Sequence, residues 1–175
     1  MHWSTRLATF SEWTGRIVAW ATLPMVAVTF VVVTLRYAFD LGWIWMQESV
    51  VWMHAAVFML AAAYTLKHDE HVRVDIFYRN LDAKRRAWVD IAGTILLLFP
   101  MMIFLLIVSW DYVHQSWLIR EGSREAGGLP FPFVPLLKSV IPATAVLIMV
   151  QGLANLLADI SKLGSDHTQN DSEQG

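Results

Sequence analysis

Four long runs of apolar residues, separated by polar segments, dominate the sequence. They cover residues 17–35, 49–66, 91–110 and 139–158, and none of them contains Asp, Glu, Lys or Arg. A helix rises about 1.5 Å per residue, so roughly 20 residues cross a hydrocarbon core of about 30 Å. Because backbone amides in lipid must be paired within the chain, we expect each run to be a transmembrane helix. The pattern predicts an all-α membrane protein with four transmembrane helices, which form one domain over residues 17–158.

The segments at both ends of the chain are predicted to lie outside the lipid. In residues 1–16, apolar side chains recur at three- and four-residue spacing, which favours an amphipathic helix on the membrane surface over a frayed terminus. Residues 159–175 become polar after a few positions and lack aromatic side chains, so we expect a disordered tail there. The first apolar run is longer than the roughly 7–15 residues of a signal-peptide core, and we expect it to stay in the membrane.

Basic residues indicate which side of the membrane each polar segment occupies. Nine of them lie in the termini and in the loop between the second and third runs, against four on the other side: Arg36, Arg120, Arg124 and Lys138. Cytoplasmic segments carry the excess of Lys and Arg, so both termini are predicted to be cytoplasmic. Tryptophans near the ends of the runs fit an interfacial belt: Trp43, Trp45, Trp110 and Trp117 outside, and Trp13 and Trp88 inside.

Composition removes several classes of function. Of the residues, 56% are hydrophobic and 16% are charged, whereas soluble domains have about 45–50% and about 25%. The chain has no Cys, and its formal charge of −2 gives no basic surface for nucleic acid. It also lacks a Gly-rich phosphate loop, a His-Glu-x-x-His pattern and a Gly-x-Ser-x-Gly elbow. We therefore expect neither enzymatic activity nor a cofactor or metal.

Histidines are the residues that could challenge this view. The segment from Lys67 to His71 is interpreted as a solvated helix end rather than a metal site, because charge gathers where a span leaves lipid. His54 and His68 are fourteen residues apart, a spacing that would suit two haems, but the facing runs supply no second set of ligands. We expect His54 to be neutral, to bond a neighbouring helix and to take no part in proton coupling.

The fourth run carries a polar stripe at helical spacing. Thr144, Gln151, Gly152 and Asn155 share one face. Amides in lipid seek partners, and a glycine between them lets another helix approach closely. We expect this face, with Gln151 and Asn155, to pack against another helix of this chain or of a partner.

The order of several short motifs resembles a known family. The first half contains Arg36-Tyr37, Trp43 and Trp45, Glu48, Ala61-Ala62-Ala63 and His71-Val72-Arg73-Val74-Asp75. The second half adds Glu121-Gly122-Ser123, Gly128-Leu129-Pro130, Lys138, Pro142 and Gln151-Gly152-Leu153. In this order, across four spans, the motifs resemble the small membrane subunit, of the DctQ type, of tripartite ATP-independent periplasmic (TRAP) transporters.

The resemblance implies a partner subunit rather than a transporter that acts alone. It implies a large TRAP membrane subunit that carries the transport sites and a periplasmic solute-binding protein that delivers the solute. It also implies uptake of small organic acids across the bacterial inner membrane, driven by an ion gradient that is usually sodium. The small subunit would then be a static scaffold in the lipid bilayer. Two alternatives stay open: a haem- or quinone-linked membrane anchor of a redox enzyme, and a free-standing helper of membrane assembly.

Within this frame the charged motif residues are candidates for structural or partner contacts. Arg36 and Glu48 flank the first outer turn, where they are expected to pair and to fix the first two spans to each other. His71 and Asp75 lie on a short amphipathic stretch that is expected to follow the inner interface or to touch the large subunit. Asp82 is placed to cap the helix that becomes the third span.

Overall fold

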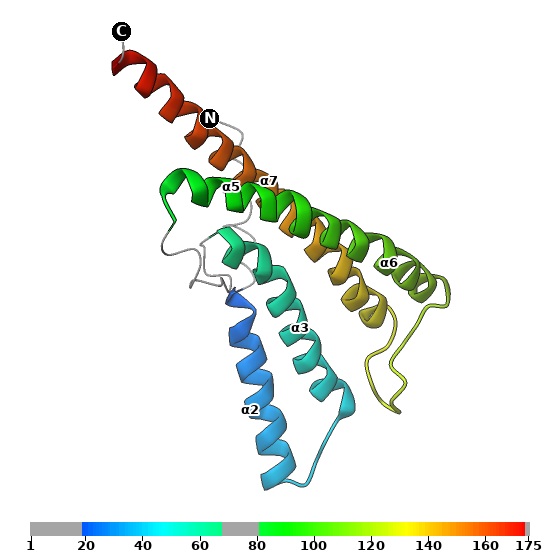
Figure 1. Ribbon diagram of the computed structural model, residues 1–175. Coiled ribbons are helices and arrows are strands. Elements are labelled where there is room, and N and C mark those ends of the chain that lie inside the picture. The colour runs from blue at the N-terminus through cyan, green and yellow to red at the C-terminus, as the bar shows by residue number, and fades with distance from the viewer. Residues whose placement is uncertain (1–18, 68–80, 174–175) are drawn as a thin grey trace.

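The computed structural model in Figure 1 describes residues 19–67 and 81–173. Its elements are helices α2 (Thr22–Ala38), α3 (Ile44–Lys67), α5 (Ala83–Gly93), α6 (Phe99–Leu118) and α7 (Phe133–Glu173), with a π-helix, η1 (Thr94–Leu98), joining α5 to α6. No strand occurs in the described residues, which confirms the all-α prediction. The predicted surface segment 1–16 and the motif residues His71 and Asp75 lie outside the described residues.

Three of the helices are long and apolar enough to cross a membrane. They are Ile44–Leu66 with 23 residues, Lys84–Leu118 with 35 and Phe133–Ser161 with 29. The first predicted run corresponds to α2, which has 17 residues. At 1.5 Å per residue α2 is about 25 Å long, a few ångströms less than a typical hydrocarbon core. The prediction of long spanning helices is thus confirmed for three of the four runs.

The helices extend beyond the apolar runs that predict them. The second run starts at residue 49, but α3 starts at Ile44, and α5, η1 and α6 together extend the third run at both ends. Each predicted run ends where the first charged residue occurs, whereas the helix itself can continue past that residue through the membrane interface into water. The tail differs most, because α7 continues through Glu173 where we expected disorder from residue 159. Adding residues to a helix that is already packed costs little, since nucleation is complete.

The helices form an open layer around α7. Helix α7 contacts α3 on one side and α5, η1 and α6 on the other, while α2 packs against α3. Figure 1 shows the pair α2 and α3 diverging from the pair α6 and α7. Small side chains fill the contacts, and Ala63, Ala145 and Ala154 are among the most buried residues. The core is therefore a set of close helix contacts rather than a closed interior.

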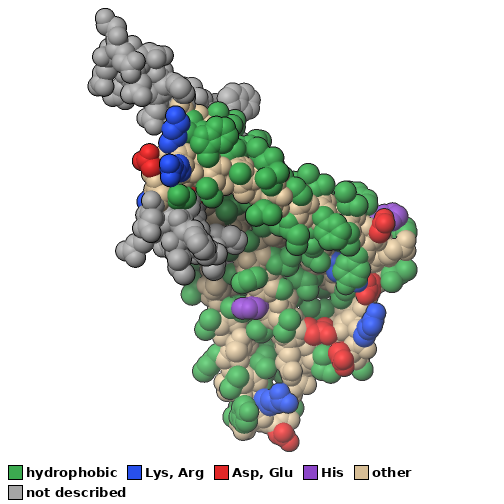
Figure 2. Space-filling view, in the orientation of Figure 1, with side chains coloured by type: hydrophobic (Ala, Val, Ile, Leu, Met, Phe, Trp, Pro, Cys, Tyr) green, Lys and Arg blue, Asp and Glu red, His purple; other side chains and the backbone are tan. Residues whose placement is uncertain are grey.

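Most of the apolar surface faces outward. In the most apolar stretches of the three long helices, only 6% to 17% of the residues are buried inside the chain. Figure 2 shows hydrophobic side chains along the whole arm that contains α5 and α6. The predicted tryptophan belt agrees with this, because Trp43, Trp45, Trp88 and Trp110 are all exposed. Such a surface requires lipid or another apolar chain as its neighbour.

The π-helix η1 has a physical cause close by in the sequence. Phe99 donates its backbone N–H to the carbonyl of Thr94, one residue farther back than in an α-helix. Pro100 follows directly, and a proline ring clashes with the carbonyl four residues before it and has no N–H to donate. The wider π turn relieves that crowding. A proline inside an apolar run indicates that the helix is disturbed there, but the sequence alone does not distinguish a bend from a π turn.

Candidate functional site: a polar clasp at the loop end

The loop between α6 and α7 is anchored to the start of α3. It covers residues 119–132 and lies at one end of the layer, where Figure 1 shows it returning toward α3. Its backbone makes one direct contact, because Trp45 donates its N–H to the carbonyl of Gly127 at 3.1 Å. Two carboxylates complete the anchorage. We call Glu48, Glu121, Ser116, Ser123 and Lys138 the loop clasp.

Glu48 holds the loop through both of its carboxylate oxygens. The side chain comes from the first turns of α3 and is half-buried. Its Oε1 accepts a hydrogen bond from the hydroxyl of Ser123, and its Oε2 accepts the backbone N–H of Leu129 at 2.6 Å. Bonds to an ionised acceptor are stronger than neutral ones. One carboxylate therefore joins α3 to two points of a loop that lies about 80 residues later in the sequence.

The close approach at Glu48 depends on a glycine. Ser123 and Leu129 are held together because the N–H of Ser123 donates to the carbonyl of Leu129 at 2.9 Å. A Cβ atom on Gly128 would lie 2.6 Å from the Cβ of Ser123 and 2.7 Å from Oε2 of Glu48. Those distances are too short for carbon and oxygen atoms, so only glycine fits. The preceding Gly127 makes the turn with φ +79, a conformation that side chains disfavour.

The way α6 ends places the second carboxylate. Arg120 adopts φ 49 directly after the helix and donates its N–H to the carbonyl of Trp117. Glu121 donates its N–H to the carbonyl of Ser116 at 3.1 Å, which completes the Schellman pattern of a helix C-terminus. This turn brings the Glu121 side chain back over the last turn of α6.

Glu121 then links α6 to α7. Its Oε2 accepts the buried hydroxyl of Ser116 at 2.6 Å and the ammonium of Lys138 at 2.5 Å. The Glu121 and Lys138 side chains are 16% and 15% exposed, so water screens this ion pair less than a surface pair. Bonding to Lys138, and then to Ser116, lowers the pKa of Glu121 below its ordinary value of 4.5. The carboxylate is the form that this arrangement favours.

Aromatic side chains surround the clasp and add further cross-links. The Lys138 ammonium lies 4.0 Å from the ring centroid of Tyr112, a cation–π geometry. Trp117 donates its indole N–H to the hydroxyl of Ser139 at 3.0 Å, which joins α6 to α7 again. Trp52 donates to the carbonyl of Phe133 at 2.9 Å, which joins α3 to the first residue of α7. The three long helices are therefore tied together at this end.

The expected pair of Arg36 and Glu48 does not form. Within the described part of the chain no ion pair joins them: Arg36 is exposed near the end of α2, and Glu48 is engaged by the loop. The prediction placed two opposite charges across a short turn, but it ignored the loop after α6, whose backbone N–H competes for the same carboxylate. Arg36 is therefore not part of the clasp and does not join α2 to it.

The polar stripe of α7 is largely buried, as predicted, because Thr144, Gln151 and Gly152 are buried and Asn155 is half-buried. Gln151 is 1% exposed, and its side-chain amide donates to the Asn155 carbonyl at 2.8 Å. The Gln151 carbonyl oxygen and the Thr144 hydroxyl are buried without a hydrogen-bond partner. Gly152 lies against η1, because a Cβ there would lie 2.9 Å from a terminal methyl of Leu98. Gln151 therefore packs inside this chain, and its amide bonds to Asn155 one turn farther along the same helix.

His54 is exposed on α3, which corrects the expectation that it bonds a neighbouring helix. Its side chain is exposed, and no hydrogen bond joins it to the rest of the described chain. Among the described residues no group of three or more His, Cys, Asp or Glu lies close enough to hold a metal ion. Asp82 directly precedes α5 and its carbonyl accepts the N–H of Arg86, so it stands where the capping prediction puts it.

The sequence contains a signal for the clasp. Glu121-Gly122-Ser123, Gly128-Leu129-Pro130 and Lys138 are motifs of the family resemblance, which by itself gives them no structural role. All three contribute to the clasp, together with Ser116, which no motif indicated. Glu121 and Glu125 enclose a glycine and a serine, and two more glycines follow at positions 127 and 128. Such a composition is typical of a loop whose backbone approaches other groups closely.

Comparisons with known proteins point in one direction. The family model described as "Tripartite ATP-independent periplasmic transporters, DctQ component" matches residues 25–162. A protein of Vibrio cholerae serotype O1 (strain ATCC 39315 / El Tor Inaba N16961) is 28% identical over 132 residues. Its name is "C4-dicarboxylate TRAP transporter small permease protein DctQ". The match covers 74% of this chain and 56% of that relative, so the chain spans little more than half of the relative's length.

Proposed function

The chain belongs to the DctQ family of tripartite ATP-independent periplasmic transporter components, and from this premise we propose that it is the scaffold subunit of an ion-driven uptake system. The family is a component of transporters and not of enzymes. As a scaffold, the chain would hold a fixed position in the membrane while a large membrane subunit moves the solute. A periplasmic solute-binding protein would deliver that solute.

The observation that carries the scaffold proposal is the contrast between tight internal contacts and an exposed apolar surface. None of the residues of α2 is buried inside the chain. The long helices likewise bury few residues in their apolar stretches. A chain with this much apolar surface gains stability when another membrane chain covers part of it, and a large permease subunit is a partner of suitable chemistry.

The use of the charged groups supports the same role. A transport site needs polar groups that can bind and release a solute or an ion near the middle of the membrane. In the described chain, Glu48 and Glu121 are instead engaged in bonds that join helices at the loop end. On α7, the buried amide of Gln151 bonds to the half-buried amide of Asn155. These groups stabilise a fixed shape.

The substrate and the driving ion are proposed from the family alone. We propose small organic acids as the substrate class and sodium as the coupling ion. The name of the Vibrio cholerae relative mentions a C4-dicarboxylate, so four-carbon dicarboxylates are the first compounds to test. The groups that choose the substrate would lie in the other subunits.

The membrane placement also belongs to the proposal. The three long helices and the family indicate a membrane protein. We propose a multi-pass protein of the bacterial inner membrane, with α2 as a fourth, shorter span and both termini in the cytoplasm. A bilayer adapts to a helix that is short by a few ångströms at a modest cost. The comparisons give no support to the haem- or quinone-linked anchor.

A reconstitution experiment tests this proposal. Vesicles would contain this chain alone, the large subunit alone, or both, with the binding protein added outside and an inward sodium gradient. We expect accumulation of a radiolabelled dicarboxylate only when both membrane subunits are present. Accumulation with this chain alone, or equal uptake with and without it, would contradict the scaffold role.

A further inference from the structure

Helix α5 presents a face on which positive charge and apolar surface lie side by side. Lys84, Arg85, Trp88 and Val89 are exposed, and we call these four residues the α5 face. On the opposite side, Ala87 and Ile91 are buried, and α5 packs against α7. The face is therefore held on a fixed helix. Figure 2 shows Lys and Arg side chains beside hydrophobic ones at this end of the molecule.

The order of the side chains along α5 fits a membrane boundary. Lys84 and Trp88 are four residues apart, as are Arg85 and Val89, so each basic residue lies one turn before an apolar one on the same side. Helical side chains tilt toward the N-terminus, which carries the two positive groups away from the apolar turn. From this point the helix continues through α6 as one apolar rod.

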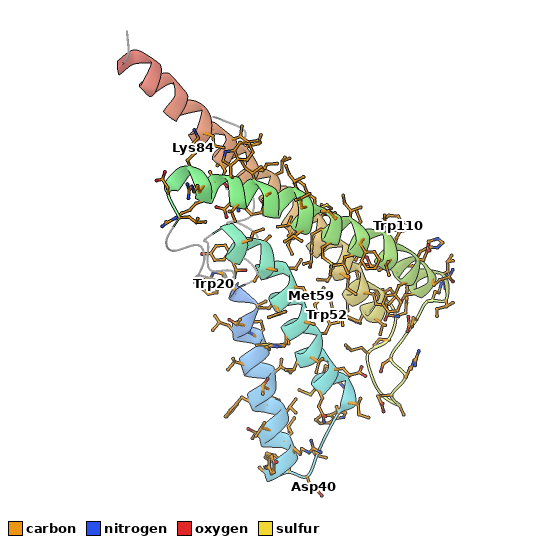
Figure 3. The ribbon with its side chains drawn as sticks, viewed as in Figure 1. Trp20, Asp40, Trp52, Met59, Lys84 and Trp110 are labelled. Carbon is orange, nitrogen blue, oxygen red and sulfur yellow. The ribbon has the colours of Figure 1, made fainter. Side chains whose placement is uncertain are left out.

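The length of that rod places the α5 face at a headgroup level. Figure 3 labels Lys84 at the start of the rod formed by α5, η1 and α6, and Trp110 on α6 about two turns before the rod ends at Leu118. Trp88 and Trp110 are both exposed, and they are 22 positions apart, which corresponds to about 33 Å of helix. This matches a hydrocarbon core of about 30 Å, and tryptophan prefers its two interfaces. Lys84 and Arg85 then lie among the lipid phosphates.

The other charged groups near this turn are engaged within the chain. Arg86 donates its Nε to the carbonyl of Leu81 at 2.8 Å. Asp82 and Asp90 each take part in an interaction within the chain. Lys84 and Arg85 remain as adjacent exposed cations, and Trp88 is 59% exposed beside them. The chemistry that complements this face has negative charge above an apolar body.

We propose that the α5 face is a binding site for an anionic phospholipid. Lys84 and Arg85 bind the phosphate and the additional negative charge of the headgroup. Trp88 and Val89 pack against the glycerol backbone and the upper part of an acyl chain. A zwitterionic lipid offers the same phosphate, but its own ammonium group competes with the two basic side chains. This inference does not depend on the proposed transport function.

Photolabelling of the full chain in nanodiscs tests the site. One sample contains phosphatidylglycerol with a photoreactive group near its glycerol, diluted in phosphatidylcholine, and the other contains equally labelled phosphatidylcholine. The labelled peptides are mapped by mass spectrometry. A basic residue near an anionic membrane surface is worth about fivefold in affinity. We therefore expect about 25-fold weaker labelling of α5 by the phosphatidylglycerol probe in the double variant Lys84→Gln/Arg85→Gln.

The matched control removes two exposed arginines at the other end of the molecule, Arg120→Gln/Arg124→Gln. It changes the net charge by the same amount, and we expect labelling of α5 to stay within twofold of the parent chain. Circular dichroism and thermal melting of each variant verify that the helices persist. Raised ionic strength should weaken the labelling by phosphatidylglycerol, because the attraction is electrostatic.

Three results would overturn the proposal. The first is equal labelling of α5 by both lipids, and the second is a double variant that the phosphatidylglycerol probe labels as strongly as it labels the parent chain. The third is loss of α5 labelling when the large membrane subunit is reconstituted with this chain, because that subunit would then cover the face. For the second result, an unchanged melting temperature of the double variant shows that the chain is folded.

Discussion

The loop end and helix α2 show two different ways in which one chain can treat its surface. At the loop end, Glu48 of α3 accepts bonds from the connecting loop, and Glu121 of that loop accepts bonds from α6 and α7. Among the described helices, α2 makes a substantial contact only with α3, and none of its residues is buried. The first region has its polar groups paired inside the chain, and the second leaves its apolar side chains to be covered from outside.

This difference separates what holds the subunit together from what the subunit offers to its surroundings. Between helices in lipid there is little hydrophobic driving force, so directed hydrogen bonds and close contacts of small residues must fix their arrangement. The clasp supplies such bonds to three helices. The surface of α2 supplies apolar area without a fixed neighbour. The comparison predicts that damage at the clasp disturbs this chain by itself, whereas damage on α2 becomes visible only in a complex.

The largest effect is expected from Glu48→Ala. The change leaves the N–H of Leu129 and the hydroxyl of Ser123 without their acceptor, and hydrogen bonds to charged groups contribute more than neutral ones. We expect a loss of about 3 kcal/mol in the free energy of unfolding. The measurement is denaturation in mild detergent followed by circular dichroism. Glu125→Ala, which removes an exposed carboxylate from the same loop, should change stability by less than about 0.5 kcal/mol. Equal effects of the two substitutions would remove the contrast.

The next effect in size is expected from Gly128→Ala. The new Cβ would lie 2.7 Å from Oε2 of Glu48, so the loop must shift away from α3. Such overpacking typically costs about 1–3 kcal/mol. Gly93→Ala is the matched control, because nothing lies within 4 Å of a Cβ there and alanine favours a helix. A melting temperature that falls only in the first variant sharpens the comparison, and a stable Gly128→Ala variant would contradict the geometry.

The apolar spans were predictable because the chemistry that selects them is local. Residues 49–66, 91–110 and 139–158 lack charge, and a lipid core forces such runs into helices whatever else the chain does. The burial of Gln151 was predictable for the same reason, since an amide in lipid seeks a partner. In these cases one segment of the sequence contains the whole physical cause.

The clasp was not predictable because its partners are far apart in the sequence. Glu48 meets Ser123 and Leu129 only after three helices have packed. The local pattern predicts that Glu48 pairs with Arg36, the nearer charge in the sequence, and that prediction is wrong. The position of His54 on an exposed face depends in the same way on which side of α3 meets α7. Long-range packing decides such choices, and the periodicity of one helix does not reveal it.

The pH dependence of stability should follow from Glu121 and is expected to be smaller. Its folded pKa is lowered below 4.5, first by the bond from Lys138. A group with a lowered folded pKa contributes stability that is fully present above the unfolded value and is lost as pH falls through the folded one. We expect the parent chain to lose stability when acidified below about pH 4.5. Glu121→Gln should lose about 1 kcal/mol at pH 7 and show a flatter acid slope. An unchanged slope would mean that another carboxylate governs it.

The smallest effect on the isolated chain is expected from Phe30→Ala on α2. Phe30 is 70% exposed, so its truncation leaves no cavity inside the chain. We expect the free energy of unfolding in detergent to change by less than about 0.5 kcal/mol. Phe104→Ala on α6, where the side chain is 60% exposed, is the matched control on the other arm. Both variants should melt like the parent chain. If the large subunit covers α2, only Phe30→Ala should lower co-purification with that subunit. Truncating a phenylalanine that is buried in the complex costs about 3–5 kcal/mol of its stability. Should Phe104→Ala weaken the complex and Phe30→Ala leave it intact, the partner would lie on the α6 arm, and the exposed face of α2 would belong to lipid.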